Sequence, residues 1–157
     1  MLSMRKPRQL QNGAHYHVSA RANRQEMILR QDSCKELFLD VVRRAKKKFP
    51  FRIENFCVME NHFHFIIQPQ RSVSLSAVMQ WIMSVFAMAW NRKHGLTGHV
   101  WGQRFFSRVI QSMRDFLQVL EYIDRNPVLG GLVATPVDWP YGGCLHRSQS
   151  NWDILDP

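Results

Sequence analysis

The apolar side chains of this chain recur with two different periods, and the order of those periods restricts the possible folds. Alternation, or a short apolar run, is typical of β-strands. Four segments have this pattern: residues 15–21, 52–59, 62–68 and 105–111. Residues 34–49 and 74–91 instead carry apolar side chains at helical spacing. A third helix is predicted for residues 114–126, and Pro127 is expected to end it.

The resulting order is strand, helix, strand, strand, helix, strand, and then a further helix. Two βαβ halves of this kind predict an α+β fold, a ferredoxin-like (RRM-like) sandwich in which helices cover one antiparallel sheet. A length of 157 residues suits a single domain. We expect a core at about residues 13–128, followed by an irregular tail at about residues 129–157 that packs onto the body.

Charge favours a polyanionic partner. The chain has 21 Lys and Arg against 12 Asp and Glu, a net charge of +9. No acidic residue precedes Glu26, and none lies between Glu60 and Asp115. The basic residues in these acid-free stretches include Arg5, Lys6, Arg8, Arg21, Arg24, Arg71, Arg92, Lys93, Arg104, Arg108 and Arg114. Two long acid-free stretches are typical of a path for nucleic acid.

The location expected from the sequence is the cytoplasm, at the nucleoid. The apolar runs are too short to span a bilayer, and the N-terminal MLSMRKPRQL lacks the apolar core of a signal peptide, so no membrane partner is predicted. The three cysteines form no CxxC pair, so neither a disulfide framework nor a zinc ribbon is indicated.

The first candidate for chemistry is the segment around His62 and His64. In a strand these two side chains share a face while Phe63 enters the core. Two imidazoles on one face can chelate a metal ion. Two exposed or hydrogen-bonded histidines would give the same pattern, and a second HxH at residues 15–17 shows how common it is. Both interpretations remain open on this motif alone.

The second candidate lies near the end of the predicted third helix. Tyr122 and Asn126 are four residues apart, so they share one face of the last turns. A phenol and an amide oxygen beside a histidine pair would form a plausible site. The simpler alternative is a tyrosine of the core and a residue at the helix end before a proline.

Together, the motifs resemble the REP-associated branch of the HUH single-tyrosine transposases, a bacterial insertion-sequence family. The matching segments, in order, are Tyr16-His17-Val18, residues 21–24, residues 58–64, residues 100–106, residues 122–127 and Asp138-Trp139-Pro140. Residues 1–157 are then predicted to form one HUH transposase-like domain. The family often has proline at the position of Glu60 and serines at Gly142 and Gly143.

The resemblance implies a transesterase that cuts single-stranded DNA beside hairpins through a 5′-phosphotyrosine intermediate. Carried over by position, Tyr122 would be the nucleophile, and His62, His64 and Asn126 the ligands of Mg²⁺ or Mn²⁺. Asn126 replaces the glutamine of the better-known mobile members, which favours the REP-associated branch. The protein would act as a monomer or a homodimer, with the nucleophile helix serving its own histidines or a partner's.

DNA contacts are predicted at Arg21, Arg24, Trp101, Arg104 and Arg108, from phosphate binding and base stacking. Phe105 and Phe106 are further stacking candidates, at least one of which we expect to be buried. One alternative is a domesticated, non-transposing protein with the same fold that binds hairpin DNA or RNA. RNA-recognition domains carry aromatic patches on the strand face where this chain has two histidines. A nuclease that activates water is disfavoured because no carboxylate lies between Glu60 and Asp115.

Overall fold

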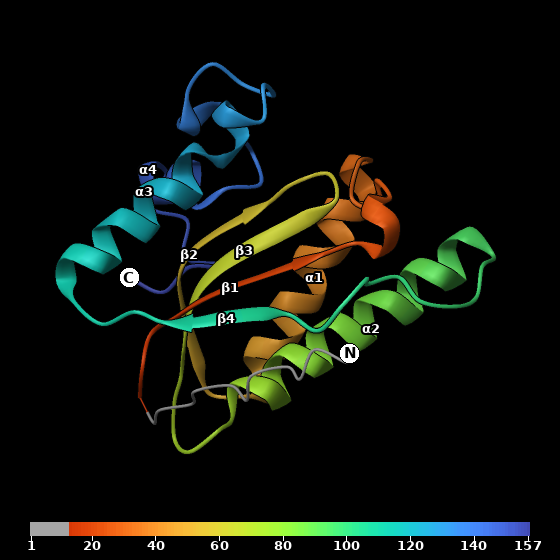
Figure 1. Cartoon of the computed structure of the whole chain (residues 1–157), viewed down its shortest axis with the longest axis horizontal. Coiled ribbons are helices and arrows are strands. Elements are labelled where there is room, and N and C mark those ends of the chain that lie inside the picture. The colour runs from red at the N-terminus through yellow and green to blue at the C-terminus, as the bar shows by residue number, and fades with distance from the viewer. Residues whose placement is uncertain (1–12) are drawn as a thin grey trace, which may run out of the picture.

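The computed structural model describes residues 13–157, so Arg5, Lys6 and Arg8 lie outside the described residues. Its elements are β1 (Tyr16–Arg21), the 3-10 turn η1 (Asn23–Gln25), α1 (Asp32–Lys48), β2 (Phe51–Val58), β3 (His62–Pro69), α2 (Leu75–His94), β4 (Phe106–Val109), α3 (Met113–Leu129), the 3-10 turn η2 (Pro136–Asp138) and α4 (Gly143–Ser148). The predicted order of strands and helices is confirmed (Figure 1). None of the helices in this part of the chain combines the length and the apolar character needed to cross a bilayer.

The strands form one antiparallel sheet in the order β2-β3-β1-β4. This order, with its two βαβ halves, defines a ferredoxin-like α+β sandwich, so the predicted fold class is confirmed. Helices α1 and α2 contact one another along one side of the sheet, and α3 contacts β2 and β3 (Figure 1). The central strands β1 and β3 therefore lie between two helical layers.

Aromatic rings form the face of the sheet that packs on α1 and α2. The ring centroid of Phe38 on α1 lies 4.7 Å from that of Phe63 on β3 and 5.5 Å from that of Phe86 on α2. All three side chains are fully buried. Burial of such a side chain contributes about 1.5–3 kcal/mol. These contacts therefore determine which face of β3 is turned inward and which is left for the site.

Helix α3 continues through Pro127, so the prediction that this proline ends the helix is wrong. Proline lacks the N–H that would bond to the carbonyl of Ile123. Backbone bonding resumes beyond it, because the N–H of Gly130 donates to the carbonyl of Asn126 over 2.9 Å. Pro127 is also buried against the body, and this packing offsets the missing hydrogen bond.

The tail beyond α3 contains η2 and the six-residue helix α4, so it is less irregular than predicted. It packs along the edge strand β2. The indole N–H of Trp139 donates to the carbonyl of Val58 (3.0 Å), and the N–H of Ile53 donates to the carboxylate of Asp156 (2.9 Å). An open edge offers unpaired peptide groups to other chains. The tail therefore protects β2 and satisfies part of its backbone.

A bulge in β2 turns Asn55 toward α3. The pairing with β3 shifts between Ile53 and Asn55, and Asn55 is completely buried. Its Nδ2 donates to the carbonyl of Leu120 (3.1 Å) and to the carboxylate of Asp124 (2.9 Å) on α3. Arg147 on α4 donates to Asn55 Oδ1 (2.8 Å) and to Asp124 Oδ2 (2.5 Å). Asn55, Asp124 and Arg147, the docking network, fasten α3 to the sheet.

The docking network depends on a glycine at the start of α4. A Cβ built on Gly143 would lie 2.0 Å from Asn55 Oδ1, a distance at which something must move. We predict that Gly143→Ala lowers the free energy of unfolding by about 1–3 kcal/mol, measured by urea denaturation. Gly142→Ala is the matched control, because its Cβ would come no closer than 3.3 Å to Trp139, and its effect should be smaller. A Gly143→Ala protein as stable as the wild type would contradict the role given to this network.

Candidate active site

His62 and His64 extend from β3 toward α3, on the face opposite Phe63. Their ring centroids are 5.2 Å apart and the rings are nearly perpendicular, at 87°. His64 is buried, whereas His62 is half-buried. The shared face predicted from their spacing is therefore present in the structure.

Each ring nitrogen of His62 faces the side-chain oxygen of an asparagine. Asn61 Nδ2 donates to the carbonyl of Gln25 (3.5 Å), so Asn61 Oδ1 accepts from His62 Nδ1 (2.8 Å). With its proton on Nδ1, a neutral His62 has a lone pair on Nε2. This nitrogen lies 3.2 Å from Asn126 Oδ1. In this tautomer both atoms present electron pairs, an arrangement that suits a cation bound by both; in the other tautomer Nε2 donates to Asn126 Oδ1.

His64 has one paired and one unpaired nitrogen. Its Nδ1 lies 3.0 Å from Nε2 of His17 on β1. Its Nε2 is buried, and no described residue provides it with a hydrogen-bond partner. Buried polar atoms are seldom left unpaired in native proteins, so this nitrogen marks a position suited to a ligand.

Tyr122 on α3 lies over these imidazoles within the same chain. Its ring centroid is 5.5 Å from that of His64, at 90°, and 6.0 Å from that of His17, at 70°. The side chain is still 48% exposed. A phenol held against the histidines but open to solvent is accessible to a large substrate. The sequence alone left open whether Tyr122 belonged to the core, and this exposure excludes that alternative.

All three imidazoles are held neutral at physiological pH. Burial, with a smaller effect from Arg108, lowers the pKa of His17 to about 4. Burial, followed by the charges of His62 and other neighbours, lowers the pKa of His64 to about 3. Burial, followed by the charge of Arg21, also lowers the pKa of His62. Neutral imidazoles keep a lone pair that can bind a cation.

The possible cation ligands at this site are few. Among residues 13–157, no three His, Cys, Asp or Glu side chains gather as a metal-binding group. Cys57 is paired with His64 across the strands, but burial, reinforced by Asp124, raises the pKa of its thiol, which keeps the proton that a metal ligand must lose. A cation here would therefore use His62, His64 and the amide oxygen of Asn126.

An ion pair fixes the start of α3 beside the site. Arg108 on β4 donates to both carboxylate oxygens of Asp115, over 2.8 and 3.0 Å. The pKa of Asp115 falls to about 2, mainly through this hydrogen bonding and then through the N–H of Gln111. Ser112 caps the helix by accepting from the N–H of Asp115. Arg108, a predicted DNA contact, is thus also a structural partner of α3.

Three other predicted DNA contacts lie together. Arg21, Arg24 and Arg104 line one hollow of about 510 Å³ between β1, η1 and the segment before β4. Arg24 has a positive φ of 53°, which the tight turn of η1 requires. Because Arg21 and His62 are paired across β1 and β3, this hollow lies next to the histidines.

The aromatic candidates divide between core and surface. The indole N–H of Trp101 donates to the carbonyl of Met83 (3.0 Å), and its ring packs on Phe63 and Phe86 in the core. Phe105 is buried, as expected for one of the phenylalanine pair, whereas Phe106 is 53% exposed and lines the same hollow as the arginines. Phe106 is therefore the more accessible platform for a base.

Sequence reasoning missed the contribution of His17. In the sequence His17 belongs to a common HxH pattern and to the opening-strand segment of the family resemblance, and neither assigns it a role at the site. The structure separates its two histidines, because His15 pairs with Glu54 while His17 contacts His64. The location of His17 in the first strand was the available signal, because in this fold that strand lies next to the strand of His62 and His64.

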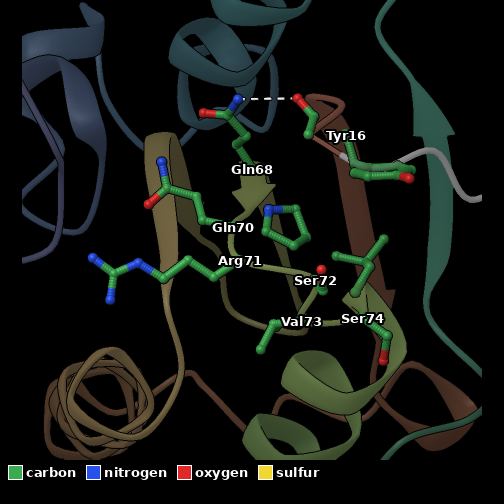
Figure 2. Close-up of a pocket in the computed structure, with 10 residues that line it drawn as sticks. Tyr16, Gln68, Gln70, Arg71, Ser72, Val73 and Ser74 are labelled. Atoms are coloured by element: carbon green, nitrogen blue, oxygen red, sulfur yellow. Dashed lines mark hydrogen bonds between the residues drawn. The ribbon is translucent and has the colours of Figure 1, made fainter.

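A second hollow lies away from the histidines. It has a volume of about 680 Å³ and is lined by residues that include Tyr16, Gln68, Arg71 and Ser72, near the start of α2 (Figure 2). Gln68 Nε2 donates across it to the carbonyl of Gly13 (3.0 Å). None of the described residues that line it is His, Cys, Asp or Glu. The described lining therefore offers no imidazole, thiol or carboxylate for a metal site.

The model of the family described as "Transposase IS200 like" matches residues 11–126, which include Tyr122 and Asn126. This match covers most of the chain, so the chain belongs to the IS200-like transposase family, whose members are enzymes that act on DNA. A curated Haemophilus influenzae protein assigned as a REP-associated tyrosine transposase is 27% identical over 137 residues, covering 76% of this chain and 77% of that protein.

Solved structures share the fold. A REP-associated tyrosine transposase bound to a REP hairpin superposes with a TM-score of 0.79 at 24% identity, covering 98% of this chain and 89% of the other. A Deinococcus radiodurans protein assigned as a transposase gives a TM-score of 0.50 at 14% identity, covering 78% of this chain and 97% of the other. The resemblance found in the sequence is thus confirmed.

The lowered pKa values predict loss of stability in acid for the metal-free protein. In the unfolded chain His64 titrates near its ordinary value of 6.5, so below that pH the unfolded state binds more protons than the native state. The contribution of His64 should be present above pH 6.5 and be lost as the pH falls toward 3, with a loss of about 2 kcal/mol at pH 5. Urea denaturation at pH 7 and 5 measures this. His64→Gln should lose less stability over the same interval, and an equal loss would contradict the assignment.

Proposed function

We propose that this chain is a metal-dependent tyrosine transesterase that cuts single-stranded DNA next to hairpins and acts as a transposase or site-specific endonuclease. One observation carries the proposal: Tyr122 lies over His64 while Asn126 lies beside His62, all within one chain. Membership of the IS200-like transposase family supports DNA as the substrate. A solved relative bound to a REP hairpin supports hairpin DNA as the partner.

His62, His64 and Asn126 would hold a divalent cation, Mg²⁺ or Mn²⁺. The fit rests on the unpaired Nε2 of buried His64 and on the His62 Nε2 lone pair facing Asn126 Oδ1. The amide oxygen, with phosphate oxygens of the substrate, makes the ligand set harder than imidazoles alone. When bound, the cation supplies Lewis-acid polarisation of the scissile phosphate and stabilises its developing charge.

Tyr122 is the proposed nucleophile. Its Oη forms a bond to phosphorus and gives up the phenolic proton, while the bond between phosphorus and the 3′ oxygen of the preceding nucleotide breaks. The 3′ oxygen takes up a proton and leaves as a free hydroxyl, and the 5′ phosphate stays on the tyrosine. The number of phosphoester bonds is conserved, so the reverse reaction can join strands without ATP.

The hollow beside the site is the proposed path of the DNA strand. Arg21, Arg24 and Arg104 provide positive charge for phosphates, and exposed Phe106 provides a face on which a base can stack. Trp101 would support this wall from the core rather than contact bases directly. Arg108 remains a candidate phosphate contact on its exposed side. A chromosomal substrate of this kind would place the protein at the nucleoid in the cytoplasm.

Tyr122→Phe tests the nucleophile. We predict that this variant loses the covalent adduct with a hairpin oligonucleotide carrying a single-stranded flank, by at least about 1000-fold, while its affinity for the hairpin is unchanged. Denaturing gels in Mn²⁺ measure the adduct, and fluorescence anisotropy measures binding. Tyr141→Phe, in the tail, is the matched control and should keep the adduct.

Two other results would change the assignment. Persistence of the adduct in Tyr122→Phe would place the nucleophile elsewhere. Tight hairpin binding by the wild type, with no adduct on any flank or in either metal, would instead favour the alternative of a domesticated hairpin-binding protein that no longer moves DNA.

A further inference from the structure

We propose that His17 is a positioning residue for the metal site: its Nε2 accepts the hydrogen of His64 Nδ1 and so keeps the His64 Nε2 lone pair directed into the site. The proposal deepens the function proposed above and rests on it for the identity of the site. It concerns a histidine outside the ligand set, on a different strand.

The sheet brings His17 and His64 onto one face. β1 and β3 are antiparallel, and Ser19 lies opposite His64 in their register. His17 is two residues from Ser19, so it shares the face of His64 and is its diagonal neighbour. The two ring planes are inclined by only 25°, the centroids are 5.3 Å apart and the nitrogens are 3.0 Å apart.

The shared hydrogen bond decides the tautomer of His64. A neutral imidazole carries one N–H and one lone pair. If His64 Nδ1 donates to His17, the lone pair is on His64 Nε2, the atom that is buried without a partner among the described residues. If His17 donates instead, His64 Nε2 carries a hydrogen and cannot bind a cation. Only the first arrangement is compatible with the proposed ligand set, and partners of this kind commonly orient metal-binding histidines.

His17 is itself held in place by its surroundings. Its ring lies edge-on to Phe106 and to Tyr122, with centroids 6.0 Å away in each case. It also lines a hollow of about 250 Å³ together with Arg108 and Asp115, the ion pair at the start of α3. The acceptor offered to His64 is therefore fixed from β4 and α3 as well as from β1.

The tautomer of His64 can be measured directly in the full metal-free chain. Long-range ¹H–¹⁵N correlation spectra at pH 7.5 should show His64 with its hydrogen on Nδ1. His17→Gln keeps an acceptor oxygen near the position of Nε2 and should preserve this tautomer. His17→Phe keeps the ring but removes the acceptor and should shift His64 toward the form with its hydrogen on Nε2. A hydrogen on Nε2 of His64 in the wild type would overturn the proposal.

Metal affinity gives the second readout. We expect Mn²⁺ binding, titrated by electron paramagnetic resonance without DNA, to weaken about 10- to 100-fold in His17→Phe and to return to within about threefold of wild type in His17→Gln. Equal affinity in His17→Phe and wild type would overturn the proposal. The tautomer measurement needs neither metal nor DNA, so it decides the role of His17 even if Tyr122 forms no adduct and the proposed function fails.

Discussion

The pairing register of β1 with β3 determines whether this molecule has a site at all. Side chains alternate between the faces of a strand, so a shift by one residue exchanges the two faces. In the observed register Phe63 and Phe65 pack with α1, while His17 and His64 meet under α3. The shifted register would place imidazoles among aromatic rings and expose phenylalanines. The apolar packing that stabilises the fold therefore also holds the histidines in position.

The position of Tyr122 depends on a polar interaction rather than an apolar one. In helix α3 only Val119, Ile123 and Pro127 are buried, and Phe116 and Leu120 pack partly against the core. So few contacts would restrain sliding of the helix only weakly, and one turn of sliding would move Tyr122 by about 5.4 Å. The docking network of Asn55, Asp124 and Arg147 fixes the register of the helix, because each polar group has a defined partner. The tail that carries Arg147 thus contributes to the site without touching it.

Periodicity predicted the strands and helices because each buries one face of a regular element. The spacing of His62 with His64, and of Tyr122 with Asn126, gave the correct faces for the same reason. The two pairs lie on different elements, so only the complete fold brings them together. Their proximity was expected only from the family resemblance. Metal binding and the phosphotyrosine intermediate remain proposals.

The features that sequence reasoning missed depend on contacts between distant segments. The continuation of α3 past Pro127 follows from burial of that proline, which no local pattern signals. The bulge at Asn55 and the helix α4 contact each other, and the need for glycine at residue 143 is understood only once Asn55 is in place. His17 was overlooked because its partner lies 47 residues away.

The central claim is that the tyrosine and the histidines of one chain form one site. A mixing experiment tests it most directly. Tyr122→Phe protein is combined with His64→Ala protein, the hairpin oligonucleotide and Mn²⁺. A tag fused to the Tyr122→Phe protein separates the two chains on a gel. The account predicts that wild type forms the adduct and that the mixture forms no more than either variant alone. An adduct on the His64→Ala chain that appears only in the mixture would contradict it, because that tyrosine would then be using the histidines of a partner subunit.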